Sequence, residues 1–315
     1  MDKDCTIYVA GHRGLVGSAL VRRLKEQGYG RIVHQTSSEL DLRDRDQVER
    51  WFSEQSIDYV FLAAAKVGGI AANQDFPADF IRDNLLIQTN VIDAAYRHNV
   101  KKLLFLGSTC IYPKLAPQPM REQDLLGGPL EPSNEPYAVA KITGIKMCQA
   151  YNRQYGTRFI SVMPTNLYGP QDNFDLHTSH VLPALIRKFH DAMVSNAASV
   201  EVWGSGEPKR EFLHSDDLAD ACVFLMKNYG GDEIVNVGWG KDIKISELAA
   251  LIGRIVGYEG DIVYDRTKPD GTPRKLVDVS RLTEMGWQAR ITLEEGLRRT
   301  YQDYLKEIYH TGGVR

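Results

Sequence analysis

The sequence TIYVAGHRGLVG, at residues 6–17, decides the fold of this 315-residue chain. Residues 6–10 form an apolar run typical of a buried strand, and an amphipathic stretch follows from about residue 15 to residue 27. Gly11, Gly14 and Gly17 recur at three-residue intervals between the two. Glycines at this point let the backbone turn tightly and approach a pyrophosphate at the N-terminus of the helix. The stretch therefore predicts the first strand, loop and helix of a dinucleotide-binding domain.

The same alternation continues through the first half of the chain. Further apolar runs lie at residues 31–35, 59–62, 102–106 and 159–163, and amphipathic stretches at 45–53, 78–99 and 137–155. Near-continuous apolar strands separated by helices are typical of a parallel sheet that is covered on both faces. The sequence thus predicts an α/β fold, a doubly wound parallel (Rossmann) sheet with a smaller C-terminal α/β substrate lobe.

The alternation loosens after about residue 170, where Gly- and Pro-rich turns interrupt shorter elements. Expected strands lie at 200–203, 234–237 and 262–264, and expected helices at 179–191, 216–228, 246–257 and 293–309. We expect residues 1–170 to form the dinucleotide-binding domain, to which some later segments return. Residues 171–315 are expected to form mainly the substrate-binding lobe.

Composition narrows the classes of partner and the cellular location. The chain has 38 Lys and Arg against 41 Asp and Glu, so no basic surface favours nucleic acid or an anionic membrane. Cys5, Cys110, Cys148 and Cys222 lie far apart and fit neither a metal-binding spacing nor a disulfide framework, so no metal is expected. The chain starts without the pattern of a secretory signal, and its longest apolar stretch, residues 59–72, is too short to span a bilayer. These features predict a cytoplasmic protein with no membrane partner.

The end of the second expected strand bears on the choice of dinucleotide. An acidic residue there binds the ribose 2′-hydroxyl of NAD, whereas cations or small polar groups admit the 2′-phosphate of NADP. Residues 35–39 read QTSSE, with no acid directly at the strand end. We therefore expect NADP(H), with Arg13 and Ser37 near the 2′-phosphate. Glu39 would instead favour NAD. The alternative interpretation of Arg13 is a surface charge that does not bind the cofactor.

Three residues have the spacing of a reductase site. Tyr137 and Lys141 are four apart on an expected helix and so share one face, and Ser108 follows a strand at the carboxyl edge of the sheet. An ammonium group beside a phenol is expected to lower the pKa of Tyr137, while the serine hydroxyl orients a substrate carbonyl. The pattern predicts catalysis at a carbonyl group.

Five blocks of sequence carry a resemblance to a known family, beyond the GxxGxxG spacing that resembles extended short-chain dehydrogenase/reductases. They read LAAAKVGGI at 62–70, LGSTCIYP at 106–113, NEPYAVAK at 134–141, PTNLYGP at 164–170 and KPDGTPRK at 268–275. The chain resembles the GDP-L-fucose synthases over nearly its whole length. This resemblance implies NADPH-dependent 3,5-epimerisation and 4-reduction of GDP-4-keto-6-deoxy-D-mannose to GDP-L-fucose, the last step of de novo GDP-fucose synthesis.

The resemblance implies that Cys110 and His180 exchange protons with substrate carbon atoms. Related sugar-nucleotide dehydratases carry an acid where this chain has Cys110. A thiol near the cationic nicotinamide ring can serve as a base, and an imidazole can return a proton on the other face. The alternatives are a buried structural thiol and a surface histidine.

The resemblance also implies two sets of binding residues. Those expected at the cofactor are Gly11, His12, Arg13, Gly14, Leu15, Val16, Gly17, Ser37, Leu106, Gly107, Ser108, Lys141, Pro164, Asn166, Leu167 and His180. Those expected at the GDP moiety of the substrate are Lys188, Trp203, Arg210, Asp270 and Lys275. Cations suit the phosphates and Trp203 suits stacking on the base. Lys188 stands where the family often has arginine. A lysine keeps the positive charge but cannot make the bidentate contact of a guanidinium group.

Two other functions compete with this interpretation. A nucleotide-sugar 4-epimerase with tightly held NAD needs Ser108, Tyr137 and Lys141 but gives no role to Cys110 and His180. A non-catalytic dinucleotide-binding regulator has no need to keep Tyr137 and Lys141. By analogy we also expect a homodimer through a four-helix interface, with Ile142, Ile145, Met147 and Tyr151 on the helix that bears Tyr137.

Overall fold

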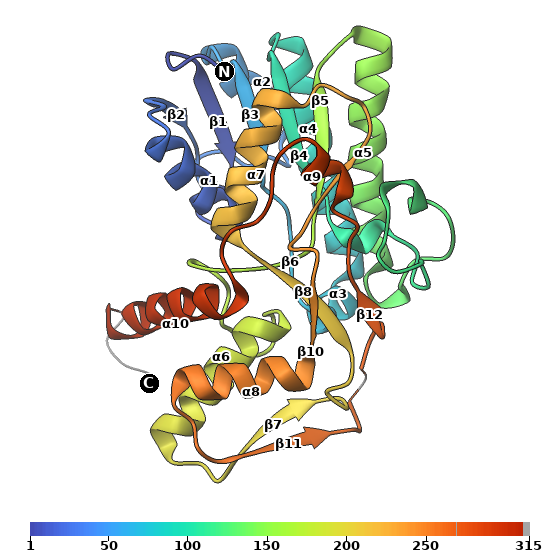
Figure 1. Ribbon diagram of the computed structural model, residues 1–315. Coiled ribbons are helices and arrows are strands. Elements are labelled where there is room, and N and C mark those ends of the chain that lie inside the picture. The colour runs from blue at the N-terminus through green and yellow to red at the C-terminus, as the bar shows by residue number, and fades with distance from the viewer. Residues whose placement is uncertain (269, 311–315) are drawn as a thin grey trace.

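A parallel six-stranded sheet forms the upper part of the computed structural model, which describes residues 1–268 and 270–310 (Figure 1). Its order is β2 (Arg31–Val33), β1 (Thr6–Ala10), β3 (Tyr59–Leu62), β4 (Lys102–Leu106), β5 (Phe159–Pro164) and β9 (Val235–Val237). The chain direction across the sheet reverses between β1 and β3, which is where doubly wound sheets bind ligands. The predicted fold class is confirmed, and β9 comes from the second half of the chain.

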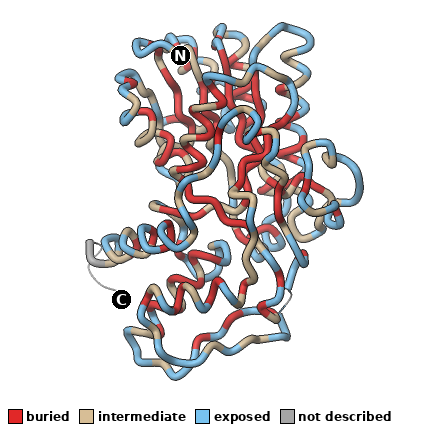
Figure 2. The backbone as a smooth tube through the Cα atoms, in the orientation of Figure 1, coloured by how far each residue is buried: buried red, intermediate tan, exposed pale blue. Residues whose placement is uncertain are grey.

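Alternating side chains of the strands supply two separate cores. In β1, Tyr8 and Ala10 belong to one core and Ile7 and Val9 to the other. The first core is covered by α2 (Arg45–Glu54), α4 (Pro77–Arg97) and α5 (Glu135–Tyr155), and the second by α1 (Leu15–Glu26) and α7 (Ser215–Asn228). Figure 2 shows the buried residues concentrated along the strands between these helices.

The lower part has its own core and short sheets. The helices are α6 (Val181–Ser195), α8 (Ile245–Val256) and α10 (Leu293–His310), packed with β7 (Ser199–Trp203), which pairs with β11 (Asp261–Asp265). A second sheet contains β8 (Lys209–His214), β6 (Asn166–Tyr168), β10 (Asp242–Lys244) and β12 (Arg274–Lys275). Short helices are α3 (Ile70–Asp75), α9 (Ser280–Glu284), η1 (Thr109–Ile111), η2 (Glu122–Asp124) and η3 (Pro132–Asn134).

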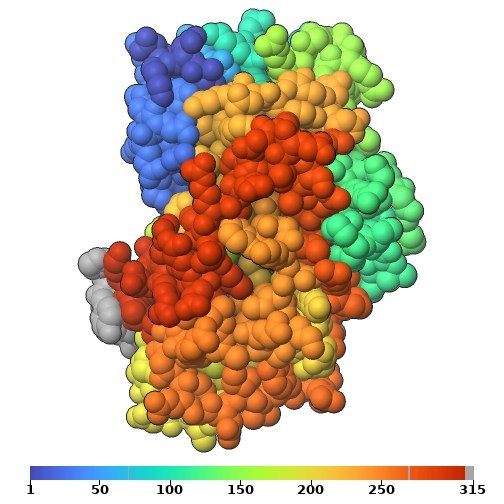
Figure 3. Space-filling model, viewed as in Figure 1, coloured from blue at the N-terminus to red at the C-terminus, as the bar shows by residue number. Residues whose placement is uncertain are grey.

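The C-terminal residues link the two parts. In Figure 3 the orange and red atoms extend over one face of the molecule, from α9 beside the sheet to α10 on the lower lobe. Within the described residues, no helix has both the length and the apolar character needed to cross a membrane.

Three of the α5 residues named with the expected dimer make contacts inside the chain. Ile142 and Ile145 are buried in the core between α5 and the sheet, so they face inward. The hydroxyl of Tyr151 donates to Asp93 of α4 at 2.9 Å. The apolar stripe of α5 therefore covers its own sheet, and the homodimer stays a prediction.

Lys102 is a buried cation that closes the end of α7. Its ammonium group donates to the carbonyl oxygens of Leu225 (3.1 Å), Met226 (2.7 Å) and Tyr229, which lie where a helix leaves carbonyls without partners. Burial, with a smaller effect of the Arg158 charge, lowers the pKa of Lys102 to about 8. The unfolded value is about 10.4, so between about pH 8 and pH 10 the unfolded chain binds more protons. This residue therefore makes stability rise with pH in that window.

We expect Lys102→Met to lower the free energy of unfolding by about 2 kcal/mol at pH 7, because the carbonyl groups at the end of α7 lose the ammonium donor. Urea unfolding at pH 7 and pH 9.5 measures this loss, and the rise of stability between the two pH values should shrink. Lys101→Met is the control, since Lys101 is exposed and pairs with Asp58 at 2.8 Å on the surface. A Lys102→Met protein as stable as the wild type would show that the ammonium adds nothing to the fold.

Candidate active site

Ser108, Tyr137 and Lys141 meet at the carboxyl end of β4. The ammonium group of Lys141 donates to the carbonyl oxygen of Leu106 at 2.7 Å and lies 5.8 Å from the centre of the Tyr137 ring. The side chain of Ser108 is near enough to the phenol of Tyr137 to lower its pKa. Helix α5 presents Tyr137 and Lys141 one turn apart, and the strand end presents Ser108. Three groups that can act on one carbonyl oxygen thus lie together, as their spacing in the sequence predicts.

Burial dominates the electrostatics of this trio. It raises the pKa of Tyr137, nearby Cys110 adds to the rise, and the side chain of Ser108 offsets part of it. Burial lowers the pKa of Lys141 to about 7, against an opposing effect of Cys110. The expectation of a lowered pKa for Tyr137 was therefore wrong, because removal from water dominates the shift. A neutral phenol is the form that can donate a proton.

Cys110 differs from the other three cysteines. It lies on η1, is partly exposed, and its Sγ accepts a hydrogen bond from Nδ2 of Asn134 at 3.1 Å. Its backbone N–H donates to Oγ of Ser108 at 3.3 Å. Cys5, Cys148 and Cys222 are buried, and burial raises the pKa of each of their thiols, to about 12 for Cys148. Of the four free thiols, Cys110 is the one placed beside the Ser108 hydroxyl.

His180 precedes α6 and is exposed. Desolvation by neighbouring protein atoms and the charge of Lys275 both lower the pKa of its imidazole, which favours the neutral form. The segment before it packs on the upper part, since Gly69 N–H donates to the carbonyl of Thr178 at 2.9 Å. The adjacent Gly68 lies against Phe80, whose ring centre is 6.3 Å from that of Tyr137. Packing thus connects His180 to the neighbourhood of Tyr137.

The glycine loop packs backbone against backbone and leaves the start of α1 open. A Cβ at Gly17 would lie 2.1 Å from the carbonyl oxygen of Gly11, and a Cβ at Gly11 would lie 2.9 Å from the backbone of Ala64. Gly14 is the N-cap residue of α1 and offers no side-chain acceptor to the first turn. The backbone N–H groups in the first turn of α1 therefore have no side-chain acceptor. Such N–H groups suit a pyrophosphate, so the residues present fit a dinucleotide.

We expect Gly17→Ala to weaken dinucleotide binding by about 100-fold. The added methyl group must displace the Gly11 backbone, and lost hydrogen bonds to a charged group contribute about 3 kcal/mol. Fluorescence titration with NADPH measures the dissociation constant. Gly30→Ala is the matched control, because nothing lies within 4 Å of its Cβ position. Equal affinities for both variants would contradict the role of the loop.

The end of β2 bears on the choice between NAD and NADP. Arg13 and Ser37 are both exposed, as a site for a 2′-phosphate requires. The carboxylate of Glu39 accepts hydrogen bonds from the backbone N–H and the hydroxyl of Thr36, both at 2.8 Å. Glu39 therefore caps its own turn, which weakens the argument for NAD. The His12 ring stacks on His34, with centroids 4.0 Å apart, and no local sequence signal pointed to His34.

The other residues expected at the cofactor follow strand ends. Leu106 ends β4 and Gly107 follows it, Pro164 ends β5, and Asn166 and Leu167 belong to β6. The side-chain amide of Asn166 donates to the carbonyl of Glu211 at 2.8 Å, which ties β6 to β8. All of them lie toward the carboxyl edge of the parallel sheet.

The five residues expected at the GDP moiety form one connected group on the lower lobe. Trp203 is 55% exposed at the end of β7, with the ammonium groups of Lys188 and Lys268 at 5.1 and 5.2 Å from its ring centre. The Asp270 carboxylate accepts hydrogen bonds from the backbone and hydroxyl of Ser205, and the Asp270 carbonyl accepts one from Arg210 at 3.4 Å. Arg210 and Lys275 are partners across β8 and β12.

Two residues of this region escaped the sequence reasoning. Lys268 belongs to the KPDGTPRK block, so its motif could have suggested it. Glu211 is completely buried, and its carboxylate accepts the backbone N–H groups of Gly240 (2.6 Å) and Val277 (3.0 Å). Burial raises the pKa of Glu211, with these hydrogen bonds opposing the shift. Through these hydrogen bonds Glu211 holds the segment after Lys275 against β8, the strand that bears Arg210.

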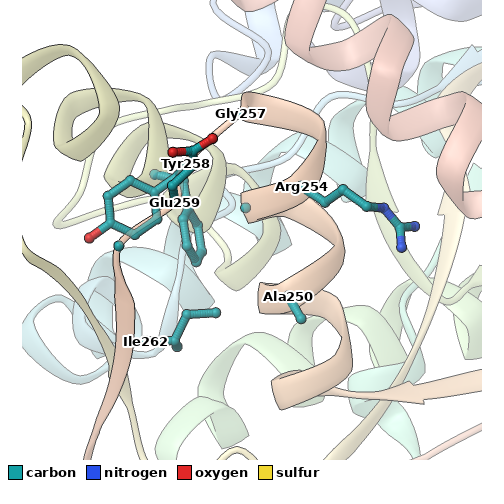
Figure 4. A pocket seen from close by; sticks show the side chains of 9 residues that line it. Ala250, Arg254, Gly257, Tyr258, Glu259 and Ile262 are labelled. Carbon is teal, nitrogen blue, oxygen red and sulfur yellow. The ribbon is translucent and has the colours of Figure 1, made fainter.

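The surface also has a hollow away from these residues. It has a volume of about 440 Å³ and lies between the C-terminal end of α8 and β11, where Ala250, Arg254, Tyr258, Glu259 and Ile262 line it (Figure 4). None of the residues expected at the cofactor or substrate contributes to it.

Comparison with known proteins agrees with the geometry. Residues 7–238 match the NAD dependent epimerase/dehydratase family. The chain is 61% identical to GDP-L-fucose synthase 1 of Arabidopsis thaliana, over 98% of this chain and 95% of that protein. It is 55% identical to GDP-L-fucose synthase of Escherichia coli K12, over 95% and 96% of the two chains. The solved structure of a GDP-L-fucose synthetase from Naegleria fowleri bound to NADP superposes with a TM-score of 0.91, at 32% identity over 99% of this chain and 97% of that chain. The chain therefore belongs to the NAD dependent epimerase/dehydratase family and, within it, to the GDP-L-fucose synthases.

Proposed function

We propose that this chain converts GDP-4-keto-6-deoxy-D-mannose into GDP-L-fucose, with NADPH as reductant. The observation that carries the proposal is the placement of Cys110 beside the Ser108–Tyr137–Lys141 group. A 4-epimerase needs the trio alone, whereas a 3,5-epimerase and 4-reductase needs a base for carbon protons as well. The names of the relatives support the same reaction.

The two inversions are proton transfers next to the ketone. The C4 carbonyl acidifies the protons on C3 and C5, so removal of either gives an enolate. Cys110 would take the proton, forming an S–H bond as the C–H bond breaks and its electron pair moves to O4. His180, as imidazolium, would deliver a proton to the opposite face of the same carbon and become the neutral imidazole that its lowered pKa favours. Before the second inversion His180 would take a proton from solvent, and the Cys110 thiol would release one. The same pair serves both carbons in turn.

The reduction needs a proton donor at the ketone oxygen. Bound NADPH supplies the hydride for C4. Tyr137 would give its phenolic proton to O4, and burial keeps the phenol neutral until that moment. Ser108 would hold O4 by its hydroxyl, and Lys141, fixed to the carbonyl of Leu106, would stabilise the phenolate that forms. The roles of Arg13, Ser37 and the glycine loop are to bind the cofactor.

The substrate nucleotide would bind along the lower lobe. Trp203 offers an exposed ring for the guanine base, and Lys188 provides a cation above that ring. Arg210 and Lys275, side by side on neighbouring strands, would bind the diphosphate. Asp270 would act by holding the turn after Trp203 in place.

A homodimer through α4 and α5 and a cytoplasmic location complete the proposal. The outward faces of these two helices carry the exposed apolar residues Leu86 and Val139, which support pairing with a second copy. Four free thiols support a reducing compartment.

The test of the reaction is NADPH oxidation with GDP-4-keto-6-deoxy-D-mannose, with the sugar product identified by NMR. The expected product is GDP-L-fucose, with one NADPH oxidised per molecule formed. Inversion at C4 of a GDP-hexose without net NADPH oxidation would instead support a 4-epimerase.

A further inference from the structure

Asn134 lies at a helix N-cap but does not make the hydrogen bond that an asparagine usually makes there. It is the N-cap residue of α5, where an Asn side chain normally accepts a hydrogen bond from the first turn. Its side chain makes no capping bond, and Nδ2 donates to the Sγ of Cys110 at 3.1 Å. A missing cap costs about 1 kcal/mol of helix stability. The sequence therefore places a good capping residue here and directs it to the sulfur.

The oxygen atom of the same side-chain amide has no hydrogen-bond partner. Oδ1 of Asn134 is buried without a hydrogen-bond partner in the described structure. An unpaired buried acceptor costs about 1–3 kcal/mol. Two unfavourable features at one side chain, both caused by its orientation toward Cys110, are typical of a functional position.

The surroundings fix this amide relative to the reacting groups. Asn134 ends η3, which packs against α3 and α5, so its backbone is held by two helices. The sulfur is close enough to Tyr137 and Lys141 for its charge to act on both. A shift of the Asn134 amide would thus move the Cys110 sulfur relative to Tyr137 and Lys141, beside which the substrate ketone would lie.

We propose that Asn134 is a positioning residue, which holds the Cys110 sulfur for proton transfer from carbon; this rests on the proposed function. The amide N–H stabilises negative charge on the sulfur before it takes the proton. Once the S–H bond has formed, a half-turn of the amide would offer Oδ1 as the acceptor, since Oδ1 breaks no hydrogen bond by moving. One side chain can therefore pair with the sulfur in both protonation states.

Asn134→Asp tests the proposal, because aspartate keeps the shape but cannot donate a hydrogen bond to sulfur. Exchange of the C3 and C5 protons for deuterium in D₂O, followed by NMR, is expected to slow by about 100-fold. Oxidation of GDP-L-fucose by NADP⁺ reports hydride transfer at C4 without any inversion, and its initial rate should stay within about threefold of wild type. Asn134→Ala, which adds no charge, should show the same division between the two activities.

Asn90→Asp is the matched control, since Asn90 is an asparagine away from the site whose Nδ2 also donates a hydrogen bond, to the Leu42 carbonyl at 2.9 Å. Melting temperature and NADP⁺ affinity are measured for each variant to show that it folds. If exchange and oxidation fall together in Asn134→Asp and Asn134→Ala, or neither falls, Asn134 is structural and the inference is wrong. If the wild type itself shows no exchange at C3 and C5, the proposed function fails instead.

Discussion

Tyr137→Phe is expected to reduce NADPH oxidation with the ketone substrate by about 1,000-fold. The phenylalanine ring fills the same space against Phe80 but has no proton for O4, and general acid catalysis contributes about 10²–10⁴ in rate. Exchange of the C3 and C5 protons should persist, because the groups proposed for it are Cys110 and His180. Stopped-flow absorbance at 340 nm follows the reduction, and NMR in D₂O follows the exchange.

The control for this variant lies on the same helix. Tyr151 of α5 donates its hydroxyl hydrogen bond to Asp93, away from the reacting groups, so Tyr151→Phe removes a phenol without touching the site. Its reduction rate should match the wild type once the protein is shown to fold. Reduction that survives in Tyr137→Phe would remove Tyr137 from the mechanism, whereas loss of both reduction and exchange would point to a damaged site.

The fold could be predicted wherever the strands are apolar throughout. All five residues of β4 are buried, and even Lys102 at its start follows this pattern by capping α7. β8 was missed because it begins with Lys209, Arg210 and Glu211, which read as a surface loop. Backbone N–H groups from distant segments make burial of Glu211 possible, and no local pattern contains that information.

The site was predictable to the extent that spacing along one element determines it. Tyr137 and Lys141 share a helical face, and Ser108 follows a strand, so periodicity alone brings them together. The sign of the pKa shift of Tyr137 could not be obtained in this way, since it depends on how much of the ring is removed from water. The contact between Asn134 and Cys110 joins residues of two different elements, and only the packing of η3 against its neighbours creates it.

Cys110→Ser is expected to separate the two halves of the reaction in the opposite sense. Serine keeps the hydrogen-bonding geometry at this position, but its hydroxyl ionises far less readily than a thiol and is a poor base for a carbon proton. Deuterium exchange at C3 and C5 should fall by at least about 100-fold. Oxidation of GDP-L-fucose by NADP⁺ needs Tyr137, Lys141 and Ser108 alone, so its initial rate should change by less than about threefold.

The product formed in the forward direction tests the same assignment independently. With slow inversion and intact hydride transfer, NADPH should reduce part of the ketone before C3 and C5 have inverted, so NMR should detect an unepimerised GDP-6-deoxyhexose. Cys148→Ser, which changes a buried thiol in the core, should give GDP-L-fucose alone. If Cys110→Ser also gives GDP-L-fucose alone at the wild-type rate, another residue is the base. The placement of Cys110 beside Ser108 would then have a structural cause, and the case for a 3,5-epimerase would depend on the relatives.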